Sequence, residues 1–316
     1  MSTTRIRRFA AAVLLLAALA IGAIAVSACG SSDSTDTSAS PSASPISVTD
    51  DTGATVTLDQ PAQKVVSIAP ADTEIAYAIG GGSKMVGGTS YDDYPEEAKS
   101  LAKVGDFSNP SIEKIVALEP DLVLAAGGIQ AGLRSKIEKL GMQVFVVDPT
   151  TYDGVMTDIT KLGQLMGLEA NAAKVVADMT AAKEKAQARV ASLDRPATFI
   201  EVYSKPLMTA GKGTFIDDLV TLAGGTNIGA AAGPGFPNFS SEVLVQDDPA
   251  VYVAMAGSQS TPGAIAKRPG YSGLAAVKDG KVYVVDDNLI ARPGPRLALG
   301  LEQLAAMIHP EASPAP

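Results

Sequence analysis

The sequence predicts an α/β protein made of two similar Rossmann-like lobes, each with a parallel sheet, joined by one long helix. The first observation is a repeat: FSNPSIEKIVALEPDLVLA (Phe107 to Ala125) returns 129 residues later as FPNFSSEVLVQDDPAVYVA (Phe236 to Ala254). The second is QVFVVD (Gln143 to Asp148), which returns in the same order as KVYVVD (Lys281 to Asp286). Such self-similarity is typical of repeated supersecondary units. A ligand cleft is expected between the lobes, because binding sites often form where two domains meet.

The first lobe, which we place at residues 46–150, begins with a β-hairpin, since residues 46–50 and 54–58 alternate around Asp51-Thr52-Gly53. Short apolar runs bounded by Gly, Pro and Asp then predict strands at residues 65–68, 84–87, 121–125 and 143–147. Helical patterns separate these runs at residues 72–79, 112–118 and 133–140. Strands that alternate with helices favour a parallel sheet covered on both faces.

A helical region at residues 151–195 connects the lobes. From Ala170 to Leu193 apolar residues recur every three or four positions, with charged residues on the other faces. At 1.5 Å per residue this helix reaches ~36 Å, about the width of a small domain, so it can pack across both lobes. The chain crosses between the predicted lobes only here. A single helical connection should bend less than several flexible strands, so we expect little closure on ligand binding.

The second lobe, at residues 196–308, repeats the scheme. Apolar runs predict strands at residues 198–202, 208–210, 251–255 and 281–285. A helix is expected at residues 215–223, closed by Gly224-Gly225, because glycine tolerates the left-handed conformation at a helix C-terminus. Residues 309–316 are left as a short tail.

The N-terminus has the pattern of an export signal. Arg5, Arg7 and Arg8 precede an apolar run from Phe9 to Val26 that ends in small residues. Cys29, the single cysteine, directly follows Ser27-Ala28 as in the bacterial lipobox, so residues 1–28 are interpreted as a lipoprotein signal peptide. A lipid on Cys29 would anchor the chain to the outer face of the cytoplasmic membrane.

Residues 29–45 consist mainly of Ser, Thr, Asp, Ala and Pro, a composition with little to bury, and predict a disordered tether. The chain carries 25 Lys and Arg against 34 Asp and Glu, and loss of the three signal arginines takes its net charge from −9 to −12. An acidic chain without basic clusters is a poor candidate for binding nucleic acid.

Two other classes of protein are disfavoured. A zinc or manganese receptor needs several converging ligands, but the single histidine, His309, is expected in solvent after the last helix. An exported α/β enzyme is the less favoured alternative, since there is no GxSxG motif and no histidine near the cleft. AGKGT (residues 210–214) lacks the leading glycine of a phosphate loop. The paired carboxylates Asp92-Asp93 and Asp217-Asp218 are interpreted as solvated.

Six segments carry a family resemblance: VVSIAPADTE (65–74), SYDDYP (90–95), SIEKIVALEPDLVLA (111–125), TAGKGTFIDDL (209–219), AGGTNI (223–228) and RPGPR (292–296). From about Val48 to Leu304 the chain resembles the substrate-binding proteins of ABC importers for cobalamin and ferric siderophores, most closely the cobalamin branch. The resemblance implies a class III periplasmic binding protein fold with an interlobe ligand cleft. It also implies a monomeric receptor, without a cofactor, that delivers its ligand to an ABC permease dimer with ATPase subunits.

In that family a glutamate near the top of each lobe docks into arginine pockets on the permease. Glu113 and Glu242 match those positions, and the repeat pairs them with each other. Each follows a serine by two residues, and serine can cap a helix, so each should lie at an exposed helix N-terminus where negative charge is favourable. The alternative is that both residues serve only the helix dipole.

The ligand cleft is expected at the loops that follow the carboxyl ends of the strands. Tyr91 matches a cleft tyrosine of the cobalamin binders, and Phe107 and Phe236 match positions that usually hold tryptophan there. Flat aromatic faces suit a corrin, although a phenylalanine can equally belong to the core. Further candidates are Asp72, Gly127, Gly128, Asp287, Asn288 and Arg292.

The chain contains no tryptophan, whereas cobalamin binders usually line the cleft with several. Cobalamin or a related corrinoid is the preferred ligand, and a ferric hydroxamate siderophore or haem stays open. A lipoprotein that senses its ligand and signals to a partner, instead of supplying a permease, is a further alternative.

Overall fold

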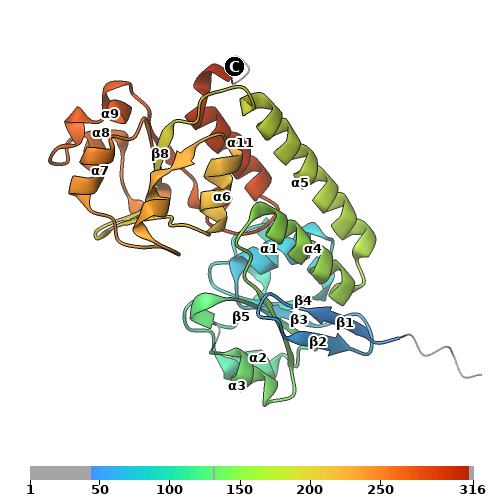
Figure 1. The fold of residues 1–316 in the computed structure, drawn as a ribbon. Coiled ribbons are helices and arrows are strands. Elements are labelled where there is room, and N and C mark those ends of the chain that lie inside the picture. Colours follow the sequence, from blue (N-terminus) through green and yellow to red (C-terminus); the bar gives the residue numbers. More distant parts are fainter. Residues whose placement is uncertain (1–43, 131, 313–316) are drawn as a thin grey trace, which may run out of the picture. The chain divides into compact units, whose positions relative to one another are not determined.

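The computed structural model describes residues 44–130 and 132–312 (Figure 1). The predicted signal peptide, Cys29, almost all of the tether and the end of the tail lie outside these residues. Within the described part of the chain, no helix is both long and apolar enough to cross a bilayer.

The first lobe contains the predicted hairpin and a five-stranded sheet. Strands β1 (Ile46–Thr49) and β2 (Thr55–Leu58) pair antiparallel, which confirms the hairpin. The sheet is parallel throughout in the order β5-β4-β3-β6-β7. Its elements are β3 (Val65–Ser67), α1 (Pro70–Ala78), β4 (Met85–Gly88), β5 (Ala102–Lys103), α2 (Ile112–Ala117), β6 (Leu122–Ala126), α3 (Arg134–Glu138) and β7 (Gln143–Val147).

The second lobe contains another five-stranded sheet, in the order β10-β8-β11-β12, with β9 antiparallel to β8. Its strands are β8 (Ala197–Ser204), β9 (Leu207–Thr209), β10 (Thr226–Asn227), β11 (Val251–Met255) and β12 (Val282–Val285). Its helices are α6 (Phe215–Leu222), α7 (Ser241–Asp247), α8 (Pro262–Ala266), α9 (Ala275–Lys278), α10 (Asp287–Ile290) and α11 (Leu297–Ile308).

The sequence repeat corresponds to a structural repeat. Its two copies begin their helix at Ile112 and Ser241, and their strand at Leu122 and Val251, so both starts differ by the same 129 residues. The second echo forms β7 and β12, each parallel to the strand of the first echo. The prediction of two similar lobes is therefore confirmed.

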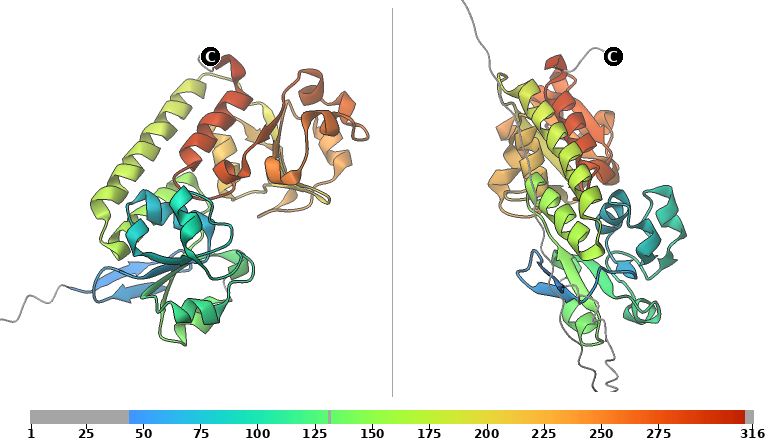
Figure 2. Two further views of the ribbon diagram at one scale, coloured as in Figure 1. Left: turned by 180° about the vertical axis from the view of Figure 1, so that it is seen from behind. Right: turned by 90° about the vertical axis from the view of Figure 1, so that its right-hand side faces the viewer.

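Two helices connect the sheets. Helix α4 (Tyr152–Met166) starts at a Thr151 cap and ends at Gly167 in the left-handed conformation, φ 66°. Helix α5 (Glu169–Val190) has 22 residues, or ~33 Å. It ends three residues before the predicted Leu193. Helix α5 packs along α4 and α11, and Figure 2 shows α5 and α11 side by side.

The central strands β3, β6 and β11 are buried on both faces, as their apolar residues predict. Along β6, Leu122 and Leu124 join a large core that includes α4, α5 and α11, whereas Val123 and Ala125 face a separate cluster beneath α2 and α3. Along β11 the same alternation separates Val253 from Tyr252. This period of two follows from the pleat of a strand.

Several polar residues expected in solvent are instead internal anchors. His309 is buried at the end of α11, with Nε2 3.1 Å from the Gly224 carbonyl oxygen. The Asp218 carboxylate accepts a hydrogen bond from the Tyr152 N–H at 2.8 Å and so joins α6 to α4. Asp217 accepts from the Asn227 amide at 2.9 Å. The expectation of solvated side chains was wrong for these three, because each has a hydrogen-bond partner on another element, 66 and 85 residues away for Asp218 and His309 and ten residues away for Asp217.

Candidate functional site

A cavity of about 350 Å³ lies at the carboxyl edge of the first sheet. Most of the residues that line it lie at or after the carboxyl ends of β3, β4, β6 and β7. Open α/β sheets bind ligands at this edge. The second lobe closes one side with Ala291, Arg292 and Pro293. The remaining lining residues are Ala69, Pro70, Ala71, Asp72, Tyr91, Phe107, Ser108, Ala126 and Val147.

Four of the predicted cleft residues line this cavity: Asp72, Tyr91, Phe107 and Arg292. The side chain of Tyr91 is 57% exposed, and Phe107 is half-buried. Two of the predicted aromatics are therefore outside the core and are free to contact a ligand. The cavity is mainly aromatic and aliphatic, which suits a flat apolar molecule.

The predicted glycines Gly127 and Gly128 follow the lining residue Ala126 in the chain but are not among the residues that line the cavity. Gly127 donates its N–H to the Val147 carbonyl oxygen, so it ties the ends of β6 and β7 together. A Cβ at Gly127 would meet the carboxylate of Asp148 at 2.0 Å, which explains why no side chain fits there. Gly128 has φ +58° and opens a short 3₁₀ turn.

The other three candidates belong to the second lobe and lie outside this cavity. Phe236 is 45% exposed on the loop before α7, so the core interpretation fails for it. Asp287 accepts the Gly257 N–H at 3.1 Å with each carboxylate oxygen, which joins the loops after β11 and β12. Asn288 donates its backbone N–H to Asp286 as part of the α10 cap.

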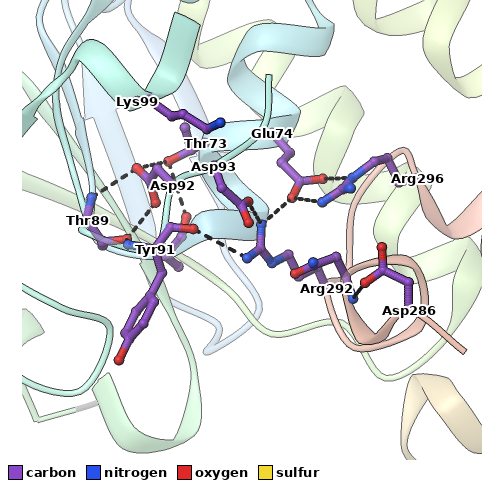
Figure 3. A network of polar contacts seen from close by, with 12 residues as sticks. Thr73, Glu74, Thr89, Tyr91, Asp92, Asp93, Lys99, Asp286, Arg292 and Arg296 are labelled. Atoms are coloured by element: carbon purple, nitrogen blue, oxygen red, sulfur yellow. Dashed lines mark hydrogen bonds and ion pairs between the residues drawn. The ribbon is translucent and has the colours of Figure 1, made fainter. Parts of the chain in front are cut away.

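An ion-pair network joins the two lobes beside the cavity (Figure 3). Arg292 contacts Glu74 at 2.9 Å and Asp93 at 2.6 Å, and also donates to the Tyr91 carbonyl oxygen. Arg296 forms a two-pronged pair with the same Glu74 at 2.7 and 2.6 Å. Burial would raise the pKa of Asp93, but hydrogen bonding and the charge of Arg292 lower it overall. This network fixes the loop that carries Tyr91.

Sequence reasoning missed Glu74, Asp93 and Arg296 as parts of this network. Arg296 also lies over the ring of Tyr94, 4.3 Å from its centroid. The two arginines of RPGPR could have indicated an ion-pair network from the sequence, because buried cations need carboxylate partners and the chain is rich in acidic residues.

Asp92 supports Tyr91 from the other side. Its carboxylate is buried and accepts hydrogen bonds from the Thr89 N–H and hydroxyl and from the Thr73 hydroxyl at 2.9 Å. The interpretation of Asp92 as solvated was therefore wrong. Its role is to bind the loop after β4 to the first turns of α1, which keeps the exposed tyrosine in place.

Asp72 is the one acidic group in the cavity wall. It is 1% exposed, and its Oδ2 has no hydrogen-bond partner among the described residues. Burial raises its pKa well above the usual value, and the carboxylates of Asp158, Asp92 and Asp51 raise it further. A favourable helix N-terminus contributes only ~0.3–1 kcal/mol, less than the cost of burying an unpaired charge. The buried position of Asp72 therefore favours the neutral form of its carboxyl group over the charged form.

Asp158, on α4, is a second buried acid. Its Oδ1 accepts a hydrogen bond from the Lys161 ammonium at 3.0 Å, whereas Oδ2 has no hydrogen-bond partner in the part of the chain that the structure describes. Burial raises the pKa of Asp158 to about 7, partly offset by Lys161 and increased by Asp51. The pKa of Asp158 is higher in the folded state than in the unfolded state. Its contribution to the stability of the fold is therefore fully present below about pH 4 and is lost as the pH rises through about 7.

We expect the wild-type chain to be less stable at pH 8 than at pH 5. Asp158→Asn should remove most of this loss, about 2–3 kcal/mol, because an amide has no charge to desolvate. Urea unfolding at both pH values measures the effect, with Asp178→Asn, an exposed carboxylate on α5, as the control. An unchanged difference between pH 5 and pH 8 in Asp158→Asn would contradict the assignment.

Glu113 and Glu242 occupy equivalent places. Each is the second residue of its helix, and both side chains are exposed. The Ser111 hydroxyl accepts from the Lys114 N–H at 3.4 Å, and the Ser240 hydroxyl accepts from the Glu242 and Val243 N–H groups. The capping prediction is confirmed. A hydrogen bond from Ser240 lowers the pKa of Glu242, so this carboxylate is ionised at neutral pH.

Across residues 44–130 and 132–312, no three His, Cys, Asp or Glu side chains group in a way that could hold a metal ion. Arg292, the one cation that lines the first cavity, is paired with Glu74 and Asp93. The mainly apolar lining can thus hold a flat apolar molecule.

Comparison with known proteins agrees with this geometry. The chain is 35% identical to YvrC of Bacillus subtilis, an ABC transporter substrate-binding lipoprotein, over 93% of this chain and 96% of that protein. Its fold matches the periplasmic vitamin B12-binding protein BtuF of Vibrio cholerae with a TM-score of 0.72, 29% identity, and coverage of 80% and 98%. It matches the periplasmic haem-binding protein RhuT of Roseiflexus with a TM-score of 0.70, 26% identity, and coverage of 79% and 99%.

These likenesses cover 80% and 79% of the chain, and the class III periplasmic binding protein fold is confirmed. The model of the periplasmic binding protein family matches residues 65–289, which include every residue of the first cavity except Ala291, Arg292 and Pro293. The chain belongs to the periplasmic binding protein family.

Proposed function

We propose that this protein is an extracytoplasmic receptor that captures cobalamin or a related corrinoid in the interlobe cleft and delivers it to an ABC permease. Similarity to a B12-binding protein and to a transporter lipoprotein supports this proposal. The chain would be a lipid-anchored monomer, held on the outer face of the membrane through Cys29 and the tether at residues 29–45. Its partners would be a permease dimer and its ATPase subunits.

The exposed aromatic wall is the single observation that carries the proposal. Tyr91 shows 57% of its surface to solvent although hydrogen bonds at Thr89, Asp92 and Arg292 fix its loop. A large aromatic residue held in water by a rigid loop gains most of its burial only when a ligand covers it. Phe107 provides a second such surface in the same cavity. A corrin has a broad, flat face that can lie against these two aromatic rings.

Removal of either aromatic should weaken binding. We expect Tyr91→Ala and Phe107→Ala each to lower the affinity for cyanocobalamin about tenfold, because stacking and burial of one ring contribute ~1–2 kcal/mol. Isothermal titration measures the change. Leu140→Ala removes an equally exposed apolar side chain outside the cavity and serves as the control. Losses below about twofold in both aromatic variants would argue against this cavity as the site.

A haem receptor is the second candidate. It is favoured by the likeness to RhuT and by the absence of tryptophan from the chain. The same aromatic variants test it, with haemin in place of cyanocobalamin.

A further inference from the structure

A second cavity, of about 460 Å³, lies at the carboxyl edge of the second sheet. It occupies the place in the second lobe that the ligand cavity occupies in the first, since both follow the ends of parallel strands. The sequence repeat relates the two places as well, because its offset pairs Gly128, which follows β6, with Gly257, which follows β11. Its lining residues are Tyr203, Ser204, Lys205, Gly257, Ser258, Gln259, Ser260, Ala264 and Arg268.

Buried polar groups hold this second cavity in shape. The carboxylate of Glu201 is fully buried and accepts hydrogen bonds from Tyr252, Ser260 and Arg268. Arg268 also donates to the Ser260 hydroxyl at 2.7 Å. Gln259, between these anchors, has φ +57°, a left-handed conformation that non-glycine residues adopt mainly at turns and functional sites. The loop after β11 is thus fixed on both sides.

Among the described residues, Lys205 is the one cation lining these two cavities that has no carboxylate partner. The charged residues that line them are Asp72, Arg292, Lys205 and Arg268. Arg292 is paired with Glu74 and Asp93, and Arg268 is paired with Glu201. Lys205 is exposed and forms no ion pair within the described residues. Beside it the ring of Tyr203 is 48% exposed.

We propose that Lys205 and Tyr203 form a second ligand subsite that recognises an anionic substituent, a carboxylate or a phosphodiester, on a molecule whose flat apolar part lies against Tyr91 and Phe107. This inference rests on the proposed function and narrows its ligand class. An ammonium group near a ligand anion makes a charge-assisted hydrogen bond, which is stronger than a neutral one. The polar second lobe and the apolar first lobe would then read two different ends of one ligand.

A different role for Lys205 is the main competitor. Lys205, Ser204 and Arg268 also line a cavity of about 630 Å³ that includes Ser241 and Glu242, at the proposed permease-docking helix. If Lys205 serves that face, its loss will lower import without changing ligand affinity. Binding and import must therefore be measured on the same variants.

Matched ligand pairs test the subsite. Cyanocobalamin carries a phosphodiester that dicyanocobinamide lacks, and haemin carries two carboxylates that its dimethyl ester lacks. The test uses whichever pair the wild-type protein binds. We expect Lys205→Ala in the full-length protein to lower the affinity for the compound with the anionic group about tenfold, and the affinity for the compound without it less than twofold. Lys205→Arg should retain most of the affinity, because it keeps the charge. Lys267→Ala, an exposed lysine of the same lobe, is the control.

The outcomes separate the two proposals. Equal losses for both members of a pair, or no loss for either, would overturn the subsite while the receptor function stands. Reduced import with unchanged affinity would assign Lys205 to the docking face. A wild-type protein that binds none of the four compounds would contradict the proposed function itself, and the subsite with it.

Discussion

Replacement of both Glu113 and Glu242 with alanine is expected to abolish import while ligand affinity stays unchanged. Each carboxylate is exposed at the start of a helix, and the two lie at equivalent positions of the repeated unit. Neither lines the ligand cavity. Two such groups, one on each lobe, would offer a permease a matched pair of negative contacts, and interfacial charges lost without a substitute cost ~2–5 kcal/mol each.

Uptake of labelled ligand by cells, with titration of the purified variants, measures both properties. Glu169→Ala removes an exposed glutamate from the first turn of α5 and serves as the control, since it is not part of the repeat. Single variants should retain partial import because one contact remains. Normal uptake by the double variant would show that these residues only stabilise their helices, a contribution of ~0.3–1 kcal/mol each.

Glu74→Ala should produce the largest loss of stability that we predict. Glu74 is 3% exposed on α1 and accepts hydrogen bonds from Arg292 and Arg296 of the other lobe. Its removal leaves Arg296 without a carboxylate in a largely buried position, and breaking such a pair costs about 3–5 kcal/mol. Urea unfolding measures the change in the free energy of unfolding.

The control for Glu74 is another pair between distant segments. Lys185 and Glu302 join α5 to α11 at 2.6 Å, but their side chains are 64% and 44% exposed. Solvent screens such pairs, so Glu302→Ala should cost less than about 1 kcal/mol. Similar losses in Glu74→Ala and Glu302→Ala would contradict the view that the buried network holds the lobes together. An intact network would also agree with the expectation of little closure on ligand binding.

Much of the fold follows from short-range patterns in the sequence. The repeat predicted both sheets because the same helix, proline and apolar strand recur after 129 residues. The apolar stripe of α5 was visible as well, with an error of three residues at its end. Strands β5 and β10 were missed, since two residues each are too few to form a pattern. They pair at the edges of their sheets, where neighbours decide the conformation.

The candidate site was less accessible to sequence analysis. Tyr91 and Phe107 were identified through a family resemblance, and the glutamates through the repeat. The polar network was not, because its members are far apart: Glu74 and Arg296 are separated by 222 residues, and Glu201 and Ser260 by 59. A buried carboxylate looks like a solvated one until its partner is placed beside it. Lys205 and Tyr203 belong to no sequence motif. Their place beside a cavity becomes visible only once the second sheet is folded.

Titration of the full-length wild-type protein with cyanocobalamin tests the central claim most directly. A receptor with the aromatic cavity described above should bind one molecule per chain with a dissociation constant of about 1 μM or lower, which corresponds to ~8 kcal/mol of binding free energy. The absence of saturable binding at about 100 μM cyanocobalamin, with stoichiometric binding of haemin under the same conditions, would contradict the corrinoid assignment and favour the haem receptor.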